Sequence, residues 1–315
     1  MKVFLTGASG YAGFYAGLRL AMAGHRVTGI VRHPEQPRLQ ELRKHEIKLI
    51  HGDVALPDTY RDELEECDAI VHTMLDKKRH FETDRAFFGA LEALSPRKPR
   101  RRLVYTTGVS IIGKVDVPLL DETVEPNPAQ PISFRRQLER EAFALKNVST
   151  VVLRPGFIFG NDGFNSISTD WCAMAEQAEP IFRGDVEKGW SWIHVDDLAE
   201  AYRLAAEAEE RVVNGEIFHI VDEHRPRCLD VMRSCLDAAG SKAKIRCEGP
   251  IKGDNISMWF DQNAYSSSTK ARELLGWTSR HDGIIASAER LFHAWKAAQP
   301  VSANTELPAA SAAIP

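Results

Sequence analysis

The sequence of 315 residues lacks several features that would decide its class at once. It has no run of about 18 apolar residues, the length that a membrane-spanning helix requires. Basic and acidic residues nearly balance, with 40 Lys and Arg against 44 Asp and Glu, so there is no basic field of the kind that nucleic-acid binding requires. We therefore expect neither a membrane nor a nucleic acid as partner.

Paired cysteines are also absent. The five cysteines are odd in number and none lies in a C-x-x-C motif, so neither a disulfide framework nor a cysteine-based zinc cage is indicated. The opening residues MKVFLTGASG begin a buried strand at once and leave no room for a signal peptide. These features predict reduced thiols and a cytoplasmic location.

Short apolar runs alternate with helical patterns in the first half of the chain. Candidates for buried strands are KVFLTG, RVTGIVR, IKLIHGD, AIVHTML, RRLVYTTG and STVVLRPG, and helical spacing is clear in FYAGLRLAMAGH and ETDRAFFGALEAL. Such alternation predicts an α/β fold, a Rossmann-like doubly wound parallel sheet with helices on both faces.

The regular alternation of strand and helix patterns ends beyond about residue 160. A Gly- and Asn-rich loop, an aromatic segment, one clear strand EIFHIV and then mostly helices follow. We expect a nucleotide-binding domain over 1–160, with part of its sheet completed by later segments, and a smaller, mostly helical substrate lobe over 161–298. Residues 299–315, rich in small residues and proline, are typical of a flexible tail.

Three glycines, Gly7, Gly10 and Gly13, lie between the first strand and the first helix in TGASGYAG. In this context the first glycine permits a tight turn, the second allows backbone N–H groups to approach a pyrophosphate, and the third permits close packing of helix on strand. The N-terminus of the helix favours negative charge. The loop therefore predicts dinucleotide binding.

The second strand ends in Arg32, where a site that prefers NAD usually has an acid. A guanidinium suits the 2′-phosphate of NADP, although a solvated arginine at a strand end is the plain alternative. Asp53, after the third strand, is expected to accept a hydrogen bond from the adenine amino group, with Val54 beside it. We expect NADP(H) as the preferred cofactor and NAD(H) as the second option.

Six segments in order resemble those of an extended short-chain dehydrogenase/reductase of the NAD-dependent epimerase/dehydratase superfamily. They are TGASGYAG, HGDV, LVYTTGVSIIG, VVLRPGFIFG, WIHVDDLAEAY and TKARELLGW, and the resemblance covers roughly residues 1 to 296. It implies a seven-stranded Rossmann-like sheet, a small C-terminal substrate domain, an NAD(P) cofactor and often a homodimer. The residues then expected to contact the cofactor are Thr6, Gly7, Ser9, Gly10, Tyr11, Ala12, Gly13, Arg32, Asp53, Val54, Thr73, Met74, Thr106, Pro155, Gly156 and Phe157.

The catalytic residues that the resemblance implies are missing. Such enzymes use a serine or threonine after the fifth strand, a tyrosine as acid and base, and a lysine four residues later. Here the serine position is Gly108. In ISFRRQLERE the tyrosine and lysine positions are Phe134 and Leu138, or one residue earlier Ser133 and Gln137, and neither register restores the pair.

Other side chains offer a replacement for this relay. Hydride transfer needs orientation and electrostatics, so Ser110 is our preferred oxyanion donor and Thr107 the second choice; alternatively both hydroxyls only cap local backbone groups. Arg135 and Arg136 begin the helix that would carry the tyrosine. One interpretation is that they hold a substrate carboxylate or enolate, and the other is that they are solvated.

A histidine and several aromatic residues complete the candidates. His194 in WIHVDDLA has an ordinary pKa near neutrality, but with the following aspartates it better fits a helix cap. An apolar substrate cleft is one interpretation of the aromatic residues, and packing of the small lobe is the other. The aromatic substrate candidates are Phe164, Trp171, Trp190 and Trp192, beside Phe157.

These observations favour an atypical NADP(H)-dependent oxidoreductase. Its substrate would be a small hydrophobic or aromatic carbonyl, imine or activated alkene, because an activated acceptor needs less acid assistance than a plain ketone. Two other functions fit the same residues. One is a non-catalytic NADP(H)-binding redox sensor, and the other is a non-redox isomerase, lyase or epimerase. No metal is predicted.

Overall fold

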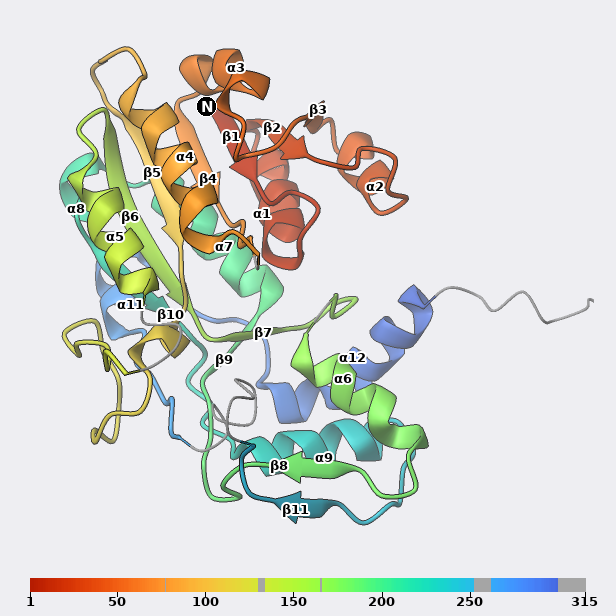
Figure 1. The fold of residues 1–315 in the computed structure, drawn as a ribbon. Helices are drawn as coiled ribbons and strands as arrows, with labels where there is room; N and C mark the ends of the chain where they lie inside the picture. The colour runs from red at the N-terminus through yellow and green to blue at the C-terminus, as the bar shows by residue number, and fades with distance from the viewer. Residues whose placement is uncertain (77, 130–133, 165, 252–261, 300–315) are drawn as a thin grey trace, which may run out of the picture.

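The computed structural model describes residues 1–76, 78–129, 134–164, 166–251 and 262–299. Seven parallel strands form its central sheet in the order β10-β6-β5-β4-β1-β2-β3 (Figure 1). The strands are β1 Lys2–Thr6, β2 Arg26–Val31, β3 Lys48–His51, β4 Ala69–His72, β5 Arg101–Thr106, β6 Val148–Pro155 and β10 Ile217–Ile220. Every residue of β4, β5 and β6 is buried, which explains why apolar residues stand next to one another in these strands rather than at alternate positions.

Helices cover both faces of the sheet, as the alternation of patterns predicts. On one face the apolar core includes side chains from α1 Tyr11–Met22, α2 Leu39–Lys44, α7 Val195–Glu207, α8 Glu210–Val213 and α11 Thr269–Leu275. On the other face the core includes side chains from α3 Arg61–Glu66, α4 His80–Glu92 and α5 Arg135–Ala144. The Rossmann-like prediction is confirmed.

A smaller lobe lies beyond the carboxyl ends of β5 and β6 (Figure 1). Two short sheets pair β7 Phe157–Phe159 with β9 Trp192–His194 and β8 Ile181–Arg183 with β11 Arg246–Glu248. Its helices are α6 Ile167–Ala173, α9 Cys228–Ala238 and α12 Ile284–Ala298, and short 3-10 turns lie at 57–59, 109–112 and 174–176. Its core is a third apolar cluster with three tryptophans.

The two lobes are not separated by a single cut at residue 160. Strand β10 forms the edge of the sheet, as a later segment was expected to do, but α7, α8 and α11 also pack on the sheet although they lie within the range 161–298 assigned to the substrate lobe. The chain therefore crosses between the lobes more than once, because the strand that completes the sheet comes after the first segments of the small lobe.

Two further expectations concern thiols and membranes. All five cysteines are free, and only Cys247 is exposed. Within the described residues, no helix combines the length and the apolar character that crossing a bilayer requires.

Candidate functional site

The glycine-rich loop forms a tight backbone cradle at the carboxyl end of β1. Gly7 has φ +74°, and the Gly10 N–H donates to the Gly7 carbonyl at 2.8 Å. A Cβ added at Gly13 would lie 2.1 Å from the Gly7 oxygen, and one added at Gly7 would lie 2.6 Å from Oγ1 of Thr73. Glycine is therefore required at both positions, and the N-terminus of α1 faces this turn. The residues present fit a pyrophosphate group.

The hydroxyl groups around this loop hold the scaffold together. Thr6 Oγ1 is 3.0 Å from Nδ1 of His72, and Thr73 donates to the Thr6 carbonyl at 2.9 Å. The Tyr11 hydroxyl donates to the carbonyl of Gly160 at 2.5 Å, which joins the phosphate loop to the small lobe. Burial raises the pKa of Tyr11 well above its ordinary value, so this phenol stays protonated.

Two arginines follow β2 in the chain, one exposed and one shielded. Arg32 is exposed at the end of β2 and has no ion pair among the described residues. Arg38, which the sequence analysis missed, lies over the rings of Phe14 and Phe164 at 4.1 and 4.3 Å and pairs with Asp162 at 3.0 Å. No motif in the sequence singles out Arg38.

The remaining predicted cofactor residues lie at the carboxyl ends of the neighbouring strands. Asp53 follows β3, accepts from the Ala55 N–H at 3.0 Å and pairs with Arg79 at 3.3 Å. Thr106 ends β5, where its hydroxyl is 3.0 Å from that of Tyr202. The others share this edge of the sheet: Ser9 in the loop, Ala12 in the first turn of α1, Val54 after β3, Met74 after β4, and Pro155, Gly156 and Phe157 at the junction of β6 and β7.

Helix α5 begins at the position where the tyrosine was expected. Phe134 precedes its first turn, with its ring centroid 4.7 Å from that of Phe81. Leu138 is 1% exposed and belongs to the apolar core between α4, α5 and the sheet. Gln137 is exposed and donates to Glu141 at 3.2 Å, while Ser133 lies outside the described residues. The candidate lysine positions therefore face the core or the solvent.

The residues of α5 that face the end of β5 are Arg135 and Glu139. Arg135 is buried, and its guanidinium donates to the carbonyls of Thr106 at 2.8 Å and Thr107 at 3.3 Å. Glu139 accepts a hydrogen bond from the Thr107 hydroxyl at 2.6 Å. Arg135 thus supports the backbone and is not available to a substrate, which corrects its assignment as a substrate residue.

A buried ion pair lies behind this contact. Glu139 and Arg154 are 0% and 1% exposed, and two hydrogen bonds of 2.9 and 2.6 Å join them in bidentate geometry. Arg136 adds a third cationic contact to Glu139 at 3.2 Å and also reaches Glu125, so it too is occupied rather than free for a substrate. The sequence analysis missed Glu139 and Arg154; a charged residue inside the apolar run VVLRPG was the available signal.

The two candidate hydroxyls differ in their availability. Thr107 is buried and its hydroxyl bonds Glu139, whereas Ser110 is half-buried in the turn 109–112. Among the described residues Ser110 has no hydrogen-bond partner, and its Oγ would be 3.5 Å from a Cβ added at Gly108. Ser110 is thus the hydroxyl that remains open to a bound molecule.

The predicted aromatic cleft is instead largely a core. Trp171, Trp190 and Trp192 are 3%, 0% and 0% exposed and belong to the apolar cluster of the small lobe. Phe157 stacks on Trp190 with centroids 3.6 Å apart. The assignment of the three tryptophans to a substrate is therefore wrong, because the small lobe uses their large apolar area for its own packing. Phe164 is 39% exposed, but it lies against Arg38.

His194 caps α7, as the plainer interpretation predicts. Its Nδ1 accepts a hydrogen bond from the Asp196 N–H at 3.2 Å. Burial and the neighbouring His281 lower the pKa of His194 to about 4, so it does not titrate near neutrality.

Comparison with known proteins agrees with this architecture. Residues 3–220 match the model of the NAD dependent epimerase/dehydratase family, which is well over half of the chain. The chain belongs to this family. Its cofactor is therefore of the NAD(P) type, and the expected resemblance is confirmed.

Individual relatives are distant. A UDP-glucose 4-epimerase of Corynebacterium glutamicum is 25% identical over 92% of this chain and 94% of its own. Tetraketide alpha-pyrone reductase 1 of Arabidopsis thaliana is 27% identical over 66% of this chain and 73% of its own. A variant of the UDP-glucuronic acid 4-epimerase of Bacillus cereus, solved with a fluorinated UDP sugar and NAD, has a TM-score of 0.79 at 17% identity and covers 94% and 99% of the two chains. At that identity the likeness shows the fold alone.

Proposed function

We propose that this protein is an NADP(H)-dependent oxidoreductase that reduces a small carbonyl, imine or activated alkene without a tyrosine and lysine pair. One observation carries the proposal. On α5, the two residues that face the end of β5 and lie four positions apart are Arg135 and Glu139, and the latter holds the hydroxyl of Thr107. Helix α5, Arg135–Ala144, thus presents an ordered polar group to the end of β5, but it carries no tyrosine.

The chemistry assigned to each residue follows from its contacts. When bound, the nicotinamide supplies the hydride. Ser110, whose hydroxyl is open, donates a hydrogen bond to the negative charge that develops on the acceptor. Thr107 and Glu139 fix the end of β5 from which the turn 109–112 begins. An imine or an activated alkene suits this arrangement because it needs less proton donation than a plain ketone.

The preference for the phosphorylated cofactor is supported by Arg32. It is exposed at the strand end nearest the expected ribose and is not engaged by another described side chain. A free guanidinium offers two donors to a 2′-phosphate. Asp53, which follows the neighbouring strand β3, is already paired with Arg79.

The part of the substrate that does not react is less defined than its reactive group. Burial of the three tryptophans removes the main argument for an aromatic cleft, so we define the acceptor by its electrophilic carbon. The relatives include a reductase and an epimerase by name, which keeps a redox function and a non-redox function both open to experiment.

The test is to follow NADPH absorbance while ketones, imines and enones of graded polarity are added, with NADPH and NADH titrations as controls. Consumption of NADPH supports the proposal. Tight binding without turnover would instead favour a redox sensor. Conversion of a substrate without net consumption would favour an isomerase, lyase or epimerase.

A further inference from the structure

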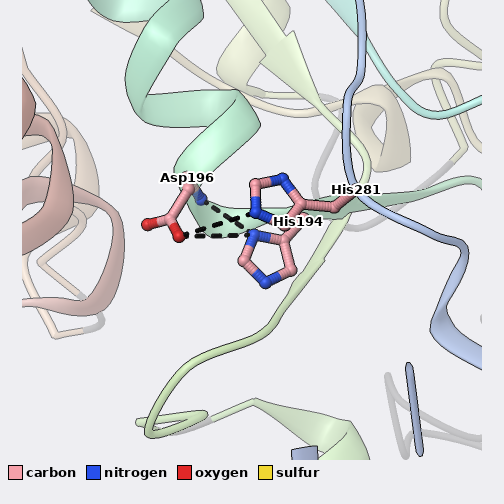
Figure 2. Close-up of side chains that lie close together, drawn as sticks. All are labelled: His194, Asp196 and His281. Atoms are coloured by element: carbon pink, nitrogen blue, oxygen red, sulfur yellow. Dashed lines mark hydrogen bonds and ion pairs between the residues drawn. The ribbon is translucent and has the colours of Figure 1, made fainter. Parts of the chain in front are cut away.

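Three side chains from two distant segments converge beside the start of α7. His194 ends β9, Asp196 lies in the first turn of α7, and His281 lies in the segment between α11 and α12. One carboxylate oxygen of Asp196 is 3.8 Å from Nδ1 of His194 and 3.9 Å from Nε2 of His281. Figure 2 shows this oxygen directed toward both rings. One ligand atom from each residue lies within 4.8 Å of the other two.

The hydrogen bonds around the cluster fix which nitrogen atoms are available. Nδ1 of His281 is 2.9 Å from Oδ1 of Asp197, so a neutral His281 carries its proton on Nδ1 and presents a lone pair at Nε2. Oδ2 of Asp197 accepts the backbone N–H groups of Arg280 and His281 at 3.0 and 3.1 Å, which locks this segment to α7. A carboxylate behind a histidine is the usual support of a metal-binding imidazole.

The opposite ring also presents an acceptor to the cluster. Nδ1 of His194 accepts the Asp196 N–H at 3.2 Å, so its proton resides on Nε2. That nitrogen packs against Gly160, where an added Cβ would lie only 2.3 Å away. The lone pair on Nδ1 is therefore used by the Asp196 N–H, and an ion in the cluster would take the place of this N–H as the partner of Nδ1.

Nδ1 of His194, one oxygen of Asp196 and Nε2 of His281 thus face one another, and the donor that the described residues direct to these three atoms is the Asp196 backbone N–H on Nδ1. The outer oxygen of Asp196 is already occupied by Asn161, whose Nδ2 donates to Oδ1 at 2.9 Å. Mutual repulsion of three acceptors is relieved by a cation. We propose that His194, Asp196 and His281 bind one divalent transition-metal ion, of which Zn²⁺ fits the donor set best.

The choice of metal follows from the donors. Two imidazole nitrogens with one carboxylate oxygen suit zinc and other first-row ions, whereas magnesium and calcium prefer oxygen ligands only. Zinc ligands bind at about 2.0–2.2 Å, so the separations of 3.8 and 3.9 Å between the carboxylate oxygen and the two nitrogens must shorten by roughly half an ångström. The rings now stack at 3.8 Å, and the His281 side chain, 39% exposed, has room to turn its Nε2 toward the ion.

The proposed ion would tie together the parts that join the two lobes. Asp196 and His194 begin the helix that packs on α1, and His281 directly precedes α12 of the small lobe. Gly160, beside His194, accepts the hydrogen bond from Tyr11 of the phosphate loop. Binding should therefore stabilise the folded chain independently of any catalytic activity, since an ion that binds only the native state raises its stability.

The test uses the full chain after treatment with a chelator. Titration with ZnCl₂, followed by calorimetry, should show one ion per chain together with a rise in the unfolding temperature, and Co²⁺ should give a visible d–d absorption band. His281→Gln and Asp196→Asn should weaken binding at least tenfold. Asp197→Asn, which leaves the ligands in place, should weaken it by about 10–100-fold.

Two further variants make the outcome decisive. His281→Cys retains a metal-binding atom and should keep stoichiometric binding, which separates loss of a ligand from damage to the fold. His293→Gln, on the exposed face of α12, removes a histidine outside the cluster and should leave binding unchanged. Absence of stoichiometric binding in the unmodified chain, or equal affinity in the His281→Gln chain, would overturn the proposal.

Discussion

The hydroxyl of Thr107 donates to the carboxylate of Glu139 at 2.6 Å, and this contact joins the end of β5 to the helix that carries the catalytic pair in related enzymes. Glu139 is fully buried and at the same time forms a bidentate pair with Arg154. Behind the end of β5, α5 thus carries a buried ion pair rather than only apolar packing.

The first prediction concerns the stability that this pair provides. Glu139→Gln should lower the free energy of unfolding by about 3–5 kcal/mol, because it leaves the buried guanidinium of Arg154 without its counter-charge. Chemical denaturation monitored by circular dichroism measures the change. Glu141→Gln on the same helix, which breaks a partly exposed pair with Arg85, should cost no more than about 1 kcal/mol. Equal losses in the two variants would contradict the structural role of Glu139.

The second prediction tests the open hydroxyl. On any substrate found among the ketones, imines and enones tested, Ser110→Ala should lower kcat by about 10²–10³-fold, which is the effect of losing one oxyanion donor. Affinity for NADPH and the unfolding temperature should not change, since the hydroxyl has no partner among the described residues. Ser234→Ala, which removes a hydroxyl bonded to its own helix α9, is the matched control. An unchanged kcat in the Ser110→Ala variant would exclude this serine as the oxyanion donor.

The phosphate loop gives the third prediction. Gly13→Ala should abolish measurable NADPH binding, because the new methyl group would lie 2.1 Å from the Gly7 carbonyl and force the cradle open. Fluorescence titration of NADPH measures the loss. Gly89→Ala in α4 adds a methyl group with nothing within 4 Å, and it should retain binding and raise stability by roughly 0.5–1 kcal/mol. Normal NADPH affinity in the Gly13→Ala protein would refute the assignment of the loop.

Much of this site was accessible from the sequence because it depends on local backbone requirements. Gly7 and Gly13 had to be glycines in a strand-turn-helix context, and the buried strands were visible from short stretches of adjacent apolar residues. The capping role of His194 was equally local, since it involves an N–H only two residues ahead.

The predictions that failed concern side chains whose role depends on their neighbours in the folded protein. The sequence around Trp190 and Trp192 is the same whether these side chains line a cleft or fill a core. Only the packing of the small lobe distinguishes the two roles. Glu139 breaks the expectation that charged residues are exposed, and its partner Arg154 comes from a strand and not from its own helix. The helix pattern of α5 could not reveal that Arg135 turns back onto backbone carbonyls.

Cofactor selection is the fourth prediction. Arg32→Gln should weaken NADPH binding by about 10–100-fold, corresponding to the roughly 1.5–3 kcal/mol of hydrogen bonds to a charged group, and leave NADH binding unchanged. Parallel titrations with both nucleotides measure the ratio of the affinities. Arg26→Gln, at the opposite end of β2, removes the same charge away from the site and should alter neither. An unchanged ratio in the Arg32→Gln protein would remove this arginine from cofactor selection.

The fifth prediction concerns Asp222, which follows β10 and is almost fully buried. Desolvation, and to a lesser extent the charges of Asp197 and Glu223, raise the pKa of this carboxyl from 3.8 to about 7. The unfolded chain therefore releases this proton near pH 4 while the folded chain holds it to about pH 7. The contribution of Asp222 to stability is present below pH 4 and is lost progressively as the pH rises to 7.

Asp222→Asn should abolish this loss, because an amide retains the acceptor for the His224 N–H, now 3.0 Å from Oδ1, and carries no charge. The free energy of unfolding of the variant, minus that of the unmodified protein, should rise by a few kcal/mol between pH 4 and pH 7, because each unit of pKa difference corresponds to about 1.4 kcal/mol. Above pH 7 this difference should stay constant. Urea denaturation at each pH measures the divergence. Asp58→Asn, which removes a carboxylate that is 91% exposed, controls for the change in net charge. Parallel stability curves for the Asp222→Asn and unmodified proteins would show that the buried carboxyl is not protonated at neutral pH.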